Sequence, residues 1–274
     1  MTKLQEKALL ISVNISQWSG RKFDKQATKS VANEYSIDAR LGRYNKVLVD
    51  SAEIKKVNKA ANKVRAFFYE KTLPWSTDCR IKSTNNYMEF MSELSKLASE
   101  FDQSVNNFCG LYSNLINKAQ RDLNGLFNPL DYPSPSKIKE KFGVNVRVLP
   151  LPSADDFRVS LQSEEIEHLK KELEKQTSES LKQAMLSIYK KIEKLTQHMA
   201  ETLADTDAKF HKTLTGNLQK VVDVLPELNL TGDAELTALG KEIKELAKVP
   251  INELKGNKAV REKQQSRLGL FQTE

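Results

Sequence analysis

Two histidine–glutamate pairs come closest to a metal-binding pattern in this sequence. His168 and Glu172 stand four residues apart, and His198 and Glu201 stand three apart, so each pair shares one face of a helix. A carboxylate-bridged metal site in a helical bundle needs several such side chains that face inward from different helices. The apolar position that faces inward beside the second pair is Met199. We therefore predict no metal ligands and no cofactor.

Other signatures of catalysis are absent from the sequence. It contains no Walker loop, no GxGxxG, no HExxH and no GxSxG pattern. Cys79 and Cys109 are 30 residues apart with no partnering Cys or His nearby, which indicates two reduced thiols. We predict that the protein is not an enzyme and assign no catalytic residue. An active site assembled from distant residues stays open as an alternative.

A basic group with nearby aromatic residues is the candidate nucleic-acid site. Residues 1–150 contain 24 Lys and Arg against 15 Asp and Glu, so this half of the chain is basic. Basic residues can follow a phosphate backbone while aromatic rings stack on bases. The alternative is a solvated helix face, because Phe68 belongs to an apolar seam. The candidates are Lys55, Lys56, Lys59, Lys63, Arg65, Tyr69 and Trp75.

A heptad-like stretch from about 160 to 203 organises the rest of the chain. Its apolar positions alternate at spacings of four and three, which is typical of a helix with one buried seam: Leu181, Met185, Ile188, Ile192, Leu195 and Met199. Two successive spacings of four around Thr177 predict a local unwinding of this seam. Such a long helix needs other helices to cover its seam.

The spacing of apolar residues predicts further long helices over 50–72 and 85–123, beside the one over 162–204. Alternating residues predict strands over 8–15, 144–149 and 157–161. The order of these elements favours an α+β fold, predominantly α, in which long antiparallel coiled-coil-like helices form a bundle with a small antiparallel sheet of about three strands.

Composition divides the chain into three predicted parts. Residues 1–160 form a basic part with a strand, paired long helices and a small sheet. Residues 161–254 form a long helical hairpin with C-terminal helices, and residues 255–274 form a basic flexible tail. No apolar run is long enough to span a membrane, and the first residues do not follow a signal-peptide pattern, so we expect a cytoplasmic protein, in the host cell if it is viral.

The C-terminal residues include a candidate partner-binding peptide. Arg267, Leu268, Leu270 and Phe271 resemble the short peptide by which bacterial replication and repair proteins bind the sliding clamp. Arg267 stands where that peptide has Gln. Two interpretations remain: the apolar residues bind a clamp, or they dock on this chain's own helices, which we favour.

The segment 153–161 (SADDFRVSL), which leads into the long charged helix, and the short N-terminal strand with paired long helices resemble an uncharacterised family of phage and mobile-element proteins. Members of this family are often encoded near a MoxR-type AAA+ ATPase and DNA-recombination genes. The resemblance implies an accessory role in a viral or plasmid setting, with an ATPase among the expected partners.

Two hypotheses for function follow. In the first, the protein is a non-enzymatic interaction protein that binds itself or another protein through its long helices. In the second, it is a DNA-binding accessory protein in recombination or replication that uses its basic N-terminal half.

Overall fold

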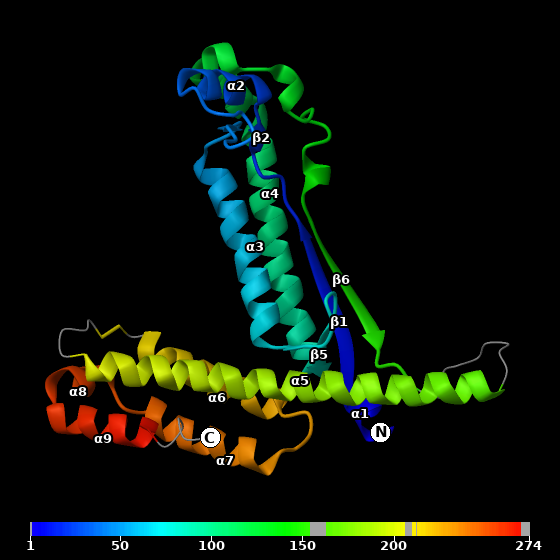
Figure 1. Ribbon diagram of the computed structural model, residues 1–274, viewed down its shortest axis with the longest axis vertical. Coiled ribbons are helices and arrows are strands. Elements are labelled where there is room, and N and C mark those ends of the chain that lie inside the picture. The colour runs from blue at the N-terminus through cyan, green and yellow to red at the C-terminus, as the bar shows by residue number, and fades with distance from the viewer. Residues whose placement is uncertain (1, 154–162, 206–209, 212, 270–274) are drawn as a thin grey trace. The chain divides into compact units, whose positions relative to one another are not determined.

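The computed structural model describes residues 2–153, 163–205, 210–211 and 213–269 (Figure 1). The chain is 67% helical and contains a four-stranded antiparallel sheet and a two-stranded sheet. These features confirm the predicted α+β class with mostly helix. In the ranges just given, no helix is both long and apolar enough to cross a membrane. The strand predicted over 157–161 lies outside the described residues.

The long helices begin and end within two residues of the predicted positions. The α-helices are α1 (Thr2–Lys7), α2 (Lys25–Glu34), α3 (Ala52–Glu70), α4 (Tyr87–Leu123), α5 (Ser163–Ala204), α6 (Thr213–Leu228), α7 (Ala234–Ala247), α8 (Ile251–Gly256) and α9 (Lys258–Gly269). Short 3-10 helices are η1 (Asn124–Leu126), η2 (Pro129–Asp131) and η3 (Lys139–Lys141). The strands are β1 (Ala8–Ser16), β2 (Arg21–Phe23), β3 (Asn45–Val47), β4 (Leu73–Pro74), β5 (Arg80–Ser83) and β6 (Gly143–Pro150).

The chain divides into two compact units that are discontinuous in sequence. Unit 1 consists of residues 1–12, 69–90 and 147–274, and unit 2 of residues 13–68 and 91–146. The sequence prediction instead placed a boundary at residue 160. The difference arises because strands and helices that are distant in sequence pack together, which composition along the chain does not reveal.

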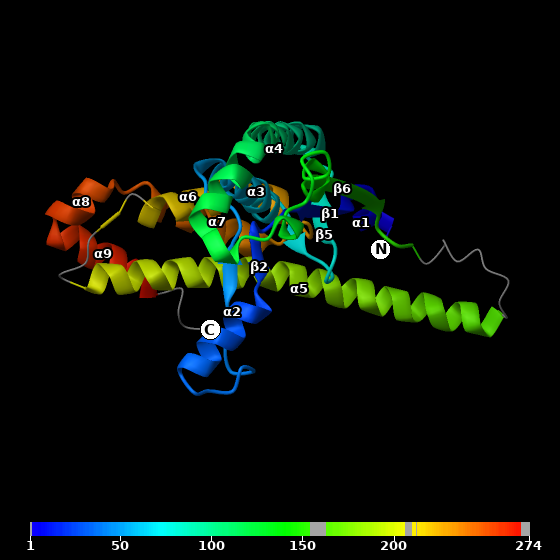
Figure 2. The ribbon, with the colours of Figure 1, turned by 90° about the horizontal axis from the view of Figure 1, so that it is seen from above.

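Helix α5 supplies the main apolar seam of unit 1. Met185, Ile188, Ile192 and Met199 are buried, as the heptad spacing predicts, and Thr177 is buried at the predicted unwinding point. Helices α6 and α9 pack against α5, and α7 packs against α6. Figures 1 and 2 both show α6 alongside α5. Within unit 1, the seam of α5 is therefore covered by helices that follow it in the chain.

Residues 255–269, part of the predicted flexible tail, are mostly helical in the structure. Helices α8 and α9 occupy almost all of this segment, and α9 runs back along α5 (Figure 1). Gln264 and Leu268 are buried, and Val260 packs against the same core, so one residue in four along α9 faces inward. The inward face of α9 is narrow and includes a glutamine, so the spacing of apolar residues in the sequence indicates this helix only weakly.

The four-stranded sheet has the order β4–β5–β1–β6. Strand β5 pairs antiparallel with β1, with Ile81 opposite Leu10, and also with β4. Sequence patterning missed β4 and β5 because both are short and β5 contains two basic residues, Arg80 and Lys82. Lys82 is nevertheless buried, and its ammonium forms an ion pair with Glu227 of α6 at 2.9 Å.

Aromatic side chains dominate the core of unit 2, where α3 and α4 lie side by side (Figures 1 and 2). Phe108 and Tyr112 of α4 contact each other and Trp18, and Phe108 also contacts Phe142, with ring centroids 5.6–6.1 Å apart. The Tyr112 hydroxyl donates a hydrogen bond to the Pro133 carbonyl at 3.1 Å. These contacts fix the segment between α4 and β6 on the helices.

Candidate binding surface

A buried charge cluster stands at the centre of the candidate surface in unit 2. The Lys46 ammonium lies 2.6 Å from an Asp131 oxygen and 2.9 Å from an Asp24 oxygen, and it donates to the Leu126 carbonyl at 2.8 Å. The second Asp131 oxygen lies 2.8 Å from the Lys22 ammonium. These contacts link strand β3 to the start of α2 and to the segment that contains η1 and η2.

The cluster shifts the pKa values of its members. Burial acts to lower the pKa of Lys46, but the hydrogen bonds to Asp131 and Asp24 outweigh it and raise this pKa above its usual value. Burial acts to raise the pKa of Asp131, and the hydrogen bonds from Lys22 and Lys46 reverse the effect and lower it. Lysine and aspartates are therefore charged at neutral pH, and the cluster serves structure instead of proton transfer.

Exposed apolar side chains gather beside this cluster. Fifteen large hydrophobic side chains are exposed among the described residues, and seven of them lie between residues 23 and 47. We define the apolar patch as five exposed residues that line two adjoining hollows or connect them: Phe23 (38% exposed), Val31 (41%), Ile37 (47%), Tyr44 (39%) and Leu126 (36%). Contiguous exposed apolar residues mark surfaces for binding other molecules.

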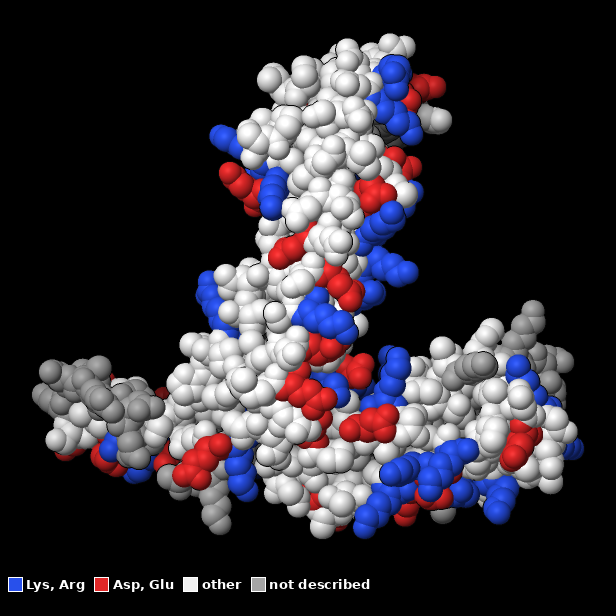
Figure 3. All heavy atoms as spheres, turned by 180° about the vertical axis from the view of Figure 1, so that it is seen from behind, with Lys and Arg blue, Asp and Glu red and all other residues white. Residues whose placement is uncertain are grey.

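The two hollows share Val31 and Tyr44. The larger has a volume of about 700 Å³, includes Phe23 and Leu126 in its wall, and reaches Lys46 of the charge cluster. The smaller has a volume of about 110 Å³ and includes Ile37. In Figure 3 the end of unit 2 that includes α2 shows broad white areas beside a few charged side chains. The patch is thus an apolar surface with two depressions, and Lys46 of the charge cluster lines the larger one.

Backbone and side-chain hydrogen bonds hold the patch in place. Asp24 caps α2 by accepting a hydrogen bond from the Ala27 amide at 2.9 Å. The Thr28 hydroxyl accepts from the Tyr44 amide at 2.9 Å, and the Asp24 amide donates to the Tyr44 carbonyl at 2.9 Å. Because these bonds tie α2 to the loop that returns from it, the apolar side chains are arranged before any partner binds.

The surroundings of the patch are basic. Residues 21–47 contain seven Lys and Arg against three Asp and Glu. The Arg43 guanidinium lies over the Phe23 ring, 4.8 Å from its centroid. A partner that complements this surface therefore combines apolar side chains with negative charge.

A second hollow of unit 2, about 620 Å³ in volume, has a cationic wall. Arg21, Lys22, Lys137 and Lys141 line it together with Trp18. Lys22 is paired with Asp131, whereas Arg21, Lys137 and Lys141 form no ion pair with another described residue. This hollow, which sequence reasoning missed, is a polyanion-binding candidate in unit 2.

The basic residues predicted on α3 are present on one helix, but most have partners. Lys59 is exposed, and Arg65 donates to Gln17 at 2.7 Å and to Asn62 at 3.1 Å. Three other lysines of α3 form ion pairs: Lys55–Asp50 at 2.7 Å, Lys56–Glu53 at 2.8 Å and Lys63–Glu100 at 3.0 Å. Exposed ion pairs are weak, so phosphates can replace the carboxylates readily.

The two aromatic members of that candidate group belong to unit 1. Tyr69 is 56% exposed and lies under the Arg80 guanidinium, 4.7 Å from its ring centroid. Trp75 packs against the core of unit 1. The structure therefore does not join the basic and aromatic candidates into one surface within a unit.

The candidate C-terminal peptide is only partly described. Leu268 is 0% exposed in the core of unit 1, and Arg267 is half-buried in the last turn of α9. Leu270 and Phe271 lie outside the described residues. Burial of Leu268 agrees with docking on the chain's own helices, and clamp binding stays a prediction.

Among the residues that the structure describes, no group of three or more His, Cys, Asp or Glu side chains could hold a metal ion. Cys79 and Cys109 are both free thiols. Burial raises the pKa of Cys109, which keeps its thiol protonated at neutral pH.

Comparisons with protein-family models, with curated proteins and with solved structures give no match to this chain. The surface of unit 2 is therefore the basis for a functional assignment.

Proposed function

We propose that this chain is a non-enzymatic, cytoplasmic binding protein that holds a segment of a partner protein on the apolar patch of unit 2. The supporting observation is the concentration of exposed apolar side chains around two hollows within a basic surface. The partner segment that fits combines apolar side chains with Asp or Glu. This proposal specifies a surface for the interaction protein expected from the sequence.

The resemblance described above suggests where to look for the partner. That resemblance implies an accessory protein of a phage or mobile element, with a MoxR-type AAA+ ATPase among the expected partners. Acidic segments of such an ATPase are the first natural candidates for the patch. A second copy of this chain is the competing occupant.

The test uses a fluorescent amphipathic helical peptide with an apolar face of Leu and Phe and a polar face of Glu. A peptide with Lys in place of Glu measures the charge preference. We expect the full chain to bind the acidic peptide with micromolar affinity and the basic peptide at least about tenfold more weakly, a difference of about 1.4 kcal/mol. Equal binding of both peptides contradicts the proposed partner chemistry.

Val31→Glu places a charge inside the patch and should weaken binding of the acidic peptide about tenfold. Leu186→Glu is the matched control, because Leu186 is similarly exposed, 46% against 41% for Val31, and lies on α5 of unit 1. Analytical ultracentrifugation of the chain alone tests the competing occupant. A dimer that Val31→Glu dissociates would assign the patch to self-association and overturn the proposal.

The cationic hollow favours a second function, binding of DNA. Lys137 and Lys141 form no ion pair with a described residue, so their charges are available to phosphates. The double variant Lys137→Glu, Lys141→Glu should weaken DNA binding and flatten its salt dependence. The control is Lys171→Glu, Lys175→Glu, two exposed lysines with the same spacing on α5. No binding to DNA at low salt removes this function.

A further inference from the structure

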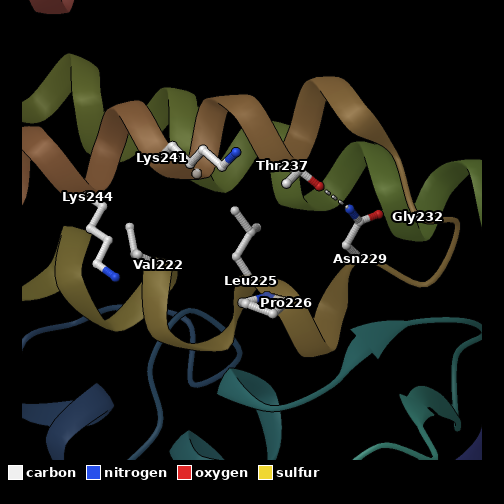
Figure 4. Close-up of a pocket in the computed structure, with 9 residues that line it drawn as sticks. Val222, Leu225, Pro226, Asn229, Gly232, Thr237, Lys241 and Lys244 are labelled. Carbon is white, nitrogen blue, oxygen red and sulfur yellow. Dashed lines mark hydrogen bonds between the residues drawn. The ribbon is translucent and has the colours of Figure 1, made fainter.

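A hollow of about 460 Å³ lies between α6 and α7 in unit 1 (Figure 4). Its volume falls in the range of small-molecule sites, about 300–1,000 Å³. The residues that line it come from both helices and from the turn that joins them: Val222, Leu225, Pro226, Asn229, Gly232, Thr237, Gly240, Lys241 and Lys244.

The two helices approach closely at Gly240. A Cβ atom at this position would lie 2.5 Å from Cδ2 of Leu225, so a larger residue would require the Leu225 side chain to move. The turn between the helices contains Gly232 with a φ of +69°, a conformation that favours glycine. Gly240 therefore leaves room for the Leu225 side chain between the helices, and Gly232 allows the conformation of the turn that joins them.

The apolar part of the wall is aliphatic. Val222, Leu225 and Pro226 of α6 supply it, and Figure 4 shows Leu225 directed from α6 toward α7. Among the residues that the structure describes, no aromatic side chain lines the hollow. Such a wall suits a flexible hydrocarbon chain and offers no ring for stacking.

The uncharged polar groups of the wall bond to their own turn. The Asn229 amide nitrogen donates to the Asp233 carbonyl at 2.8 Å and to the Thr237 hydroxyl at 3.1 Å, and its oxygen accepts from the Asp233 amide at 2.8 Å. The Thr237 hydroxyl donates to the Asp233 carbonyl at 2.8 Å. The dashed line in Figure 4 marks the bond between Asn229 and Thr237. A ligand would have to break this network to use these groups.

Two ammonium groups remain at the rim. Lys241 and Lys244 are exposed, stand three residues apart on α7, and form no ion pair within the described part of the chain. In Figure 4 the Lys244 side chain extends from α7 toward the Val222 side of the hollow. Both charged side chains that line the hollow are therefore positive, and they lie beside an aliphatic wall.

We propose that this hollow binds a small aliphatic carboxylate, with its hydrocarbon chain on Val222, Leu225 and Pro226 and its carboxylate between Lys241 and Lys244. The site is independent of the patch and the cationic hollow of unit 2 and goes beyond the protein-binding function. Either proposal can fail without the other.

Isothermal titration calorimetry of the full chain with decanoate, decanol and acetate tests this site. We expect saturable binding of decanoate, with decanol and acetate at least about tenfold weaker because each lacks one half of the recognised chemistry. Equal affinity for decanol overturns the role of the lysines, and equal affinity for acetate overturns the role of the aliphatic wall. No heat with decanoate rejects the site.

The variant Lys241→Gln, Lys244→Gln removes both charges from exposed positions and should leave the fold intact. It should weaken decanoate binding about tenfold or more. Lys171→Gln, Lys175→Gln on α5 is the matched control and should bind decanoate as the unchanged chain does. If both variants weaken binding equally, the attraction comes from net charge and the proposed site is wrong.

Discussion

Replacing Lys82 by methionine would leave Glu227 partly buried in unit 1 without its ion-pair partner. The Lys82 side chain is 0% exposed, and its ammonium lies 2.9 Å from Glu227 and 3.3 Å from the Asn85 carbonyl. The Asn86 side-chain amide also donates a hydrogen bond to Glu227, at 3.3 Å. Methionine keeps the length and apolar body of lysine, so the variant mainly removes the charge.

The expected loss of stability follows from the burial of both partners. Removing one member of a fully buried pair costs about 3–5 kcal/mol, because the other charge remains unpaired. The Glu227 side chain is 18% exposed, so water compensates part of the loss. We expect the lower end of that range, about 3 kcal/mol. For unit 1, which spans residues 1–12, 69–90 and 147–274, this loss corresponds to about 6–12 °C in the melting temperature.

The loss should depend on pH. Burial acts to raise the pKa of Glu227, but the hydrogen bond from Lys82 outweighs it and lowers this pKa below the usual 4.5. A depressed carboxyl pKa stabilises the fold above the unfolded value, and this contribution disappears as the pH falls through the folded value. In Lys82→Met, burial without the ion-pair partner raises the pKa of Glu227. Protonation of Glu227 then removes the cost of its unpaired charge. The difference in melting temperature between the two chains should therefore shrink from pH 7 to pH 4.

Thermal unfolding followed by circular dichroism at both pH values measures the effect. The double variant Lys82→Met, Glu227→Leu is the control, because replacing a buried pair by apolar residues is close to neutral. We expect it to recover most of the stability that the single variant loses. A single variant as stable as the unchanged chain, or a loss that grows in acid, would refute the reasoning.

Three further changes probe the core of unit 1. Ile188→Asp buries an unpaired charge in the seam of α5 and should abolish the cooperative thermal transition. Gly240→Ala should cost about 1–3 kcal/mol in urea unfolding, and this cost should be smaller in a chain that already carries Leu225→Ala, because the added methyl group then has room. Leu268→Ala should cost about 2–4 kcal/mol, whereas Leu186→Ala on the surface should cost under about 1 kcal/mol; equal losses would show that α9 does not pack as described.

The long helices could be predicted from the sequence because their evidence is local. Apolar residues at spacings of three and four set one face of α3, α4 and α5, and the helix ends follow within two residues. Strands β1 and β6 alternate over nine and eight residues and were predicted for the same reason.

Elements with distant partners escaped prediction. Strand β5 contains Lys82, which normally indicates an exposed position, and only Glu227, 145 residues later, explains its burial. In helix α9 the polar residue Gln264 is buried, so the sequence does not show an apolar helix face at this position. In both cases the environment that decides burial is supplied by another part of the chain.

The binding surface of unit 2 could be found only in part from sequence. Phe23, Ala27, Val31 and Tyr35 recur every four residues, which is the spacing of one helix face and predicts burial. This spacing therefore does not reveal that Phe23 and Val31 are exposed. Lys46 and Asp131 are 85 residues apart, and only the fold brings them together. Apolar residues outside every predicted seam were the available signal for this surface.

The two buried lysines have a consequence for chemical labelling. Among the described residues, Lys46 in unit 2 and Lys82 in unit 1 are the lysines that solvent hardly reaches, and each ammonium is engaged by a carboxylate. An amine-reactive ester modifies only accessible, deprotonated amines, so both should acylate late, after local opening. Peptide mass spectrometry over a time course would then give two separate opening rates, one for each unit, in the unaltered protein.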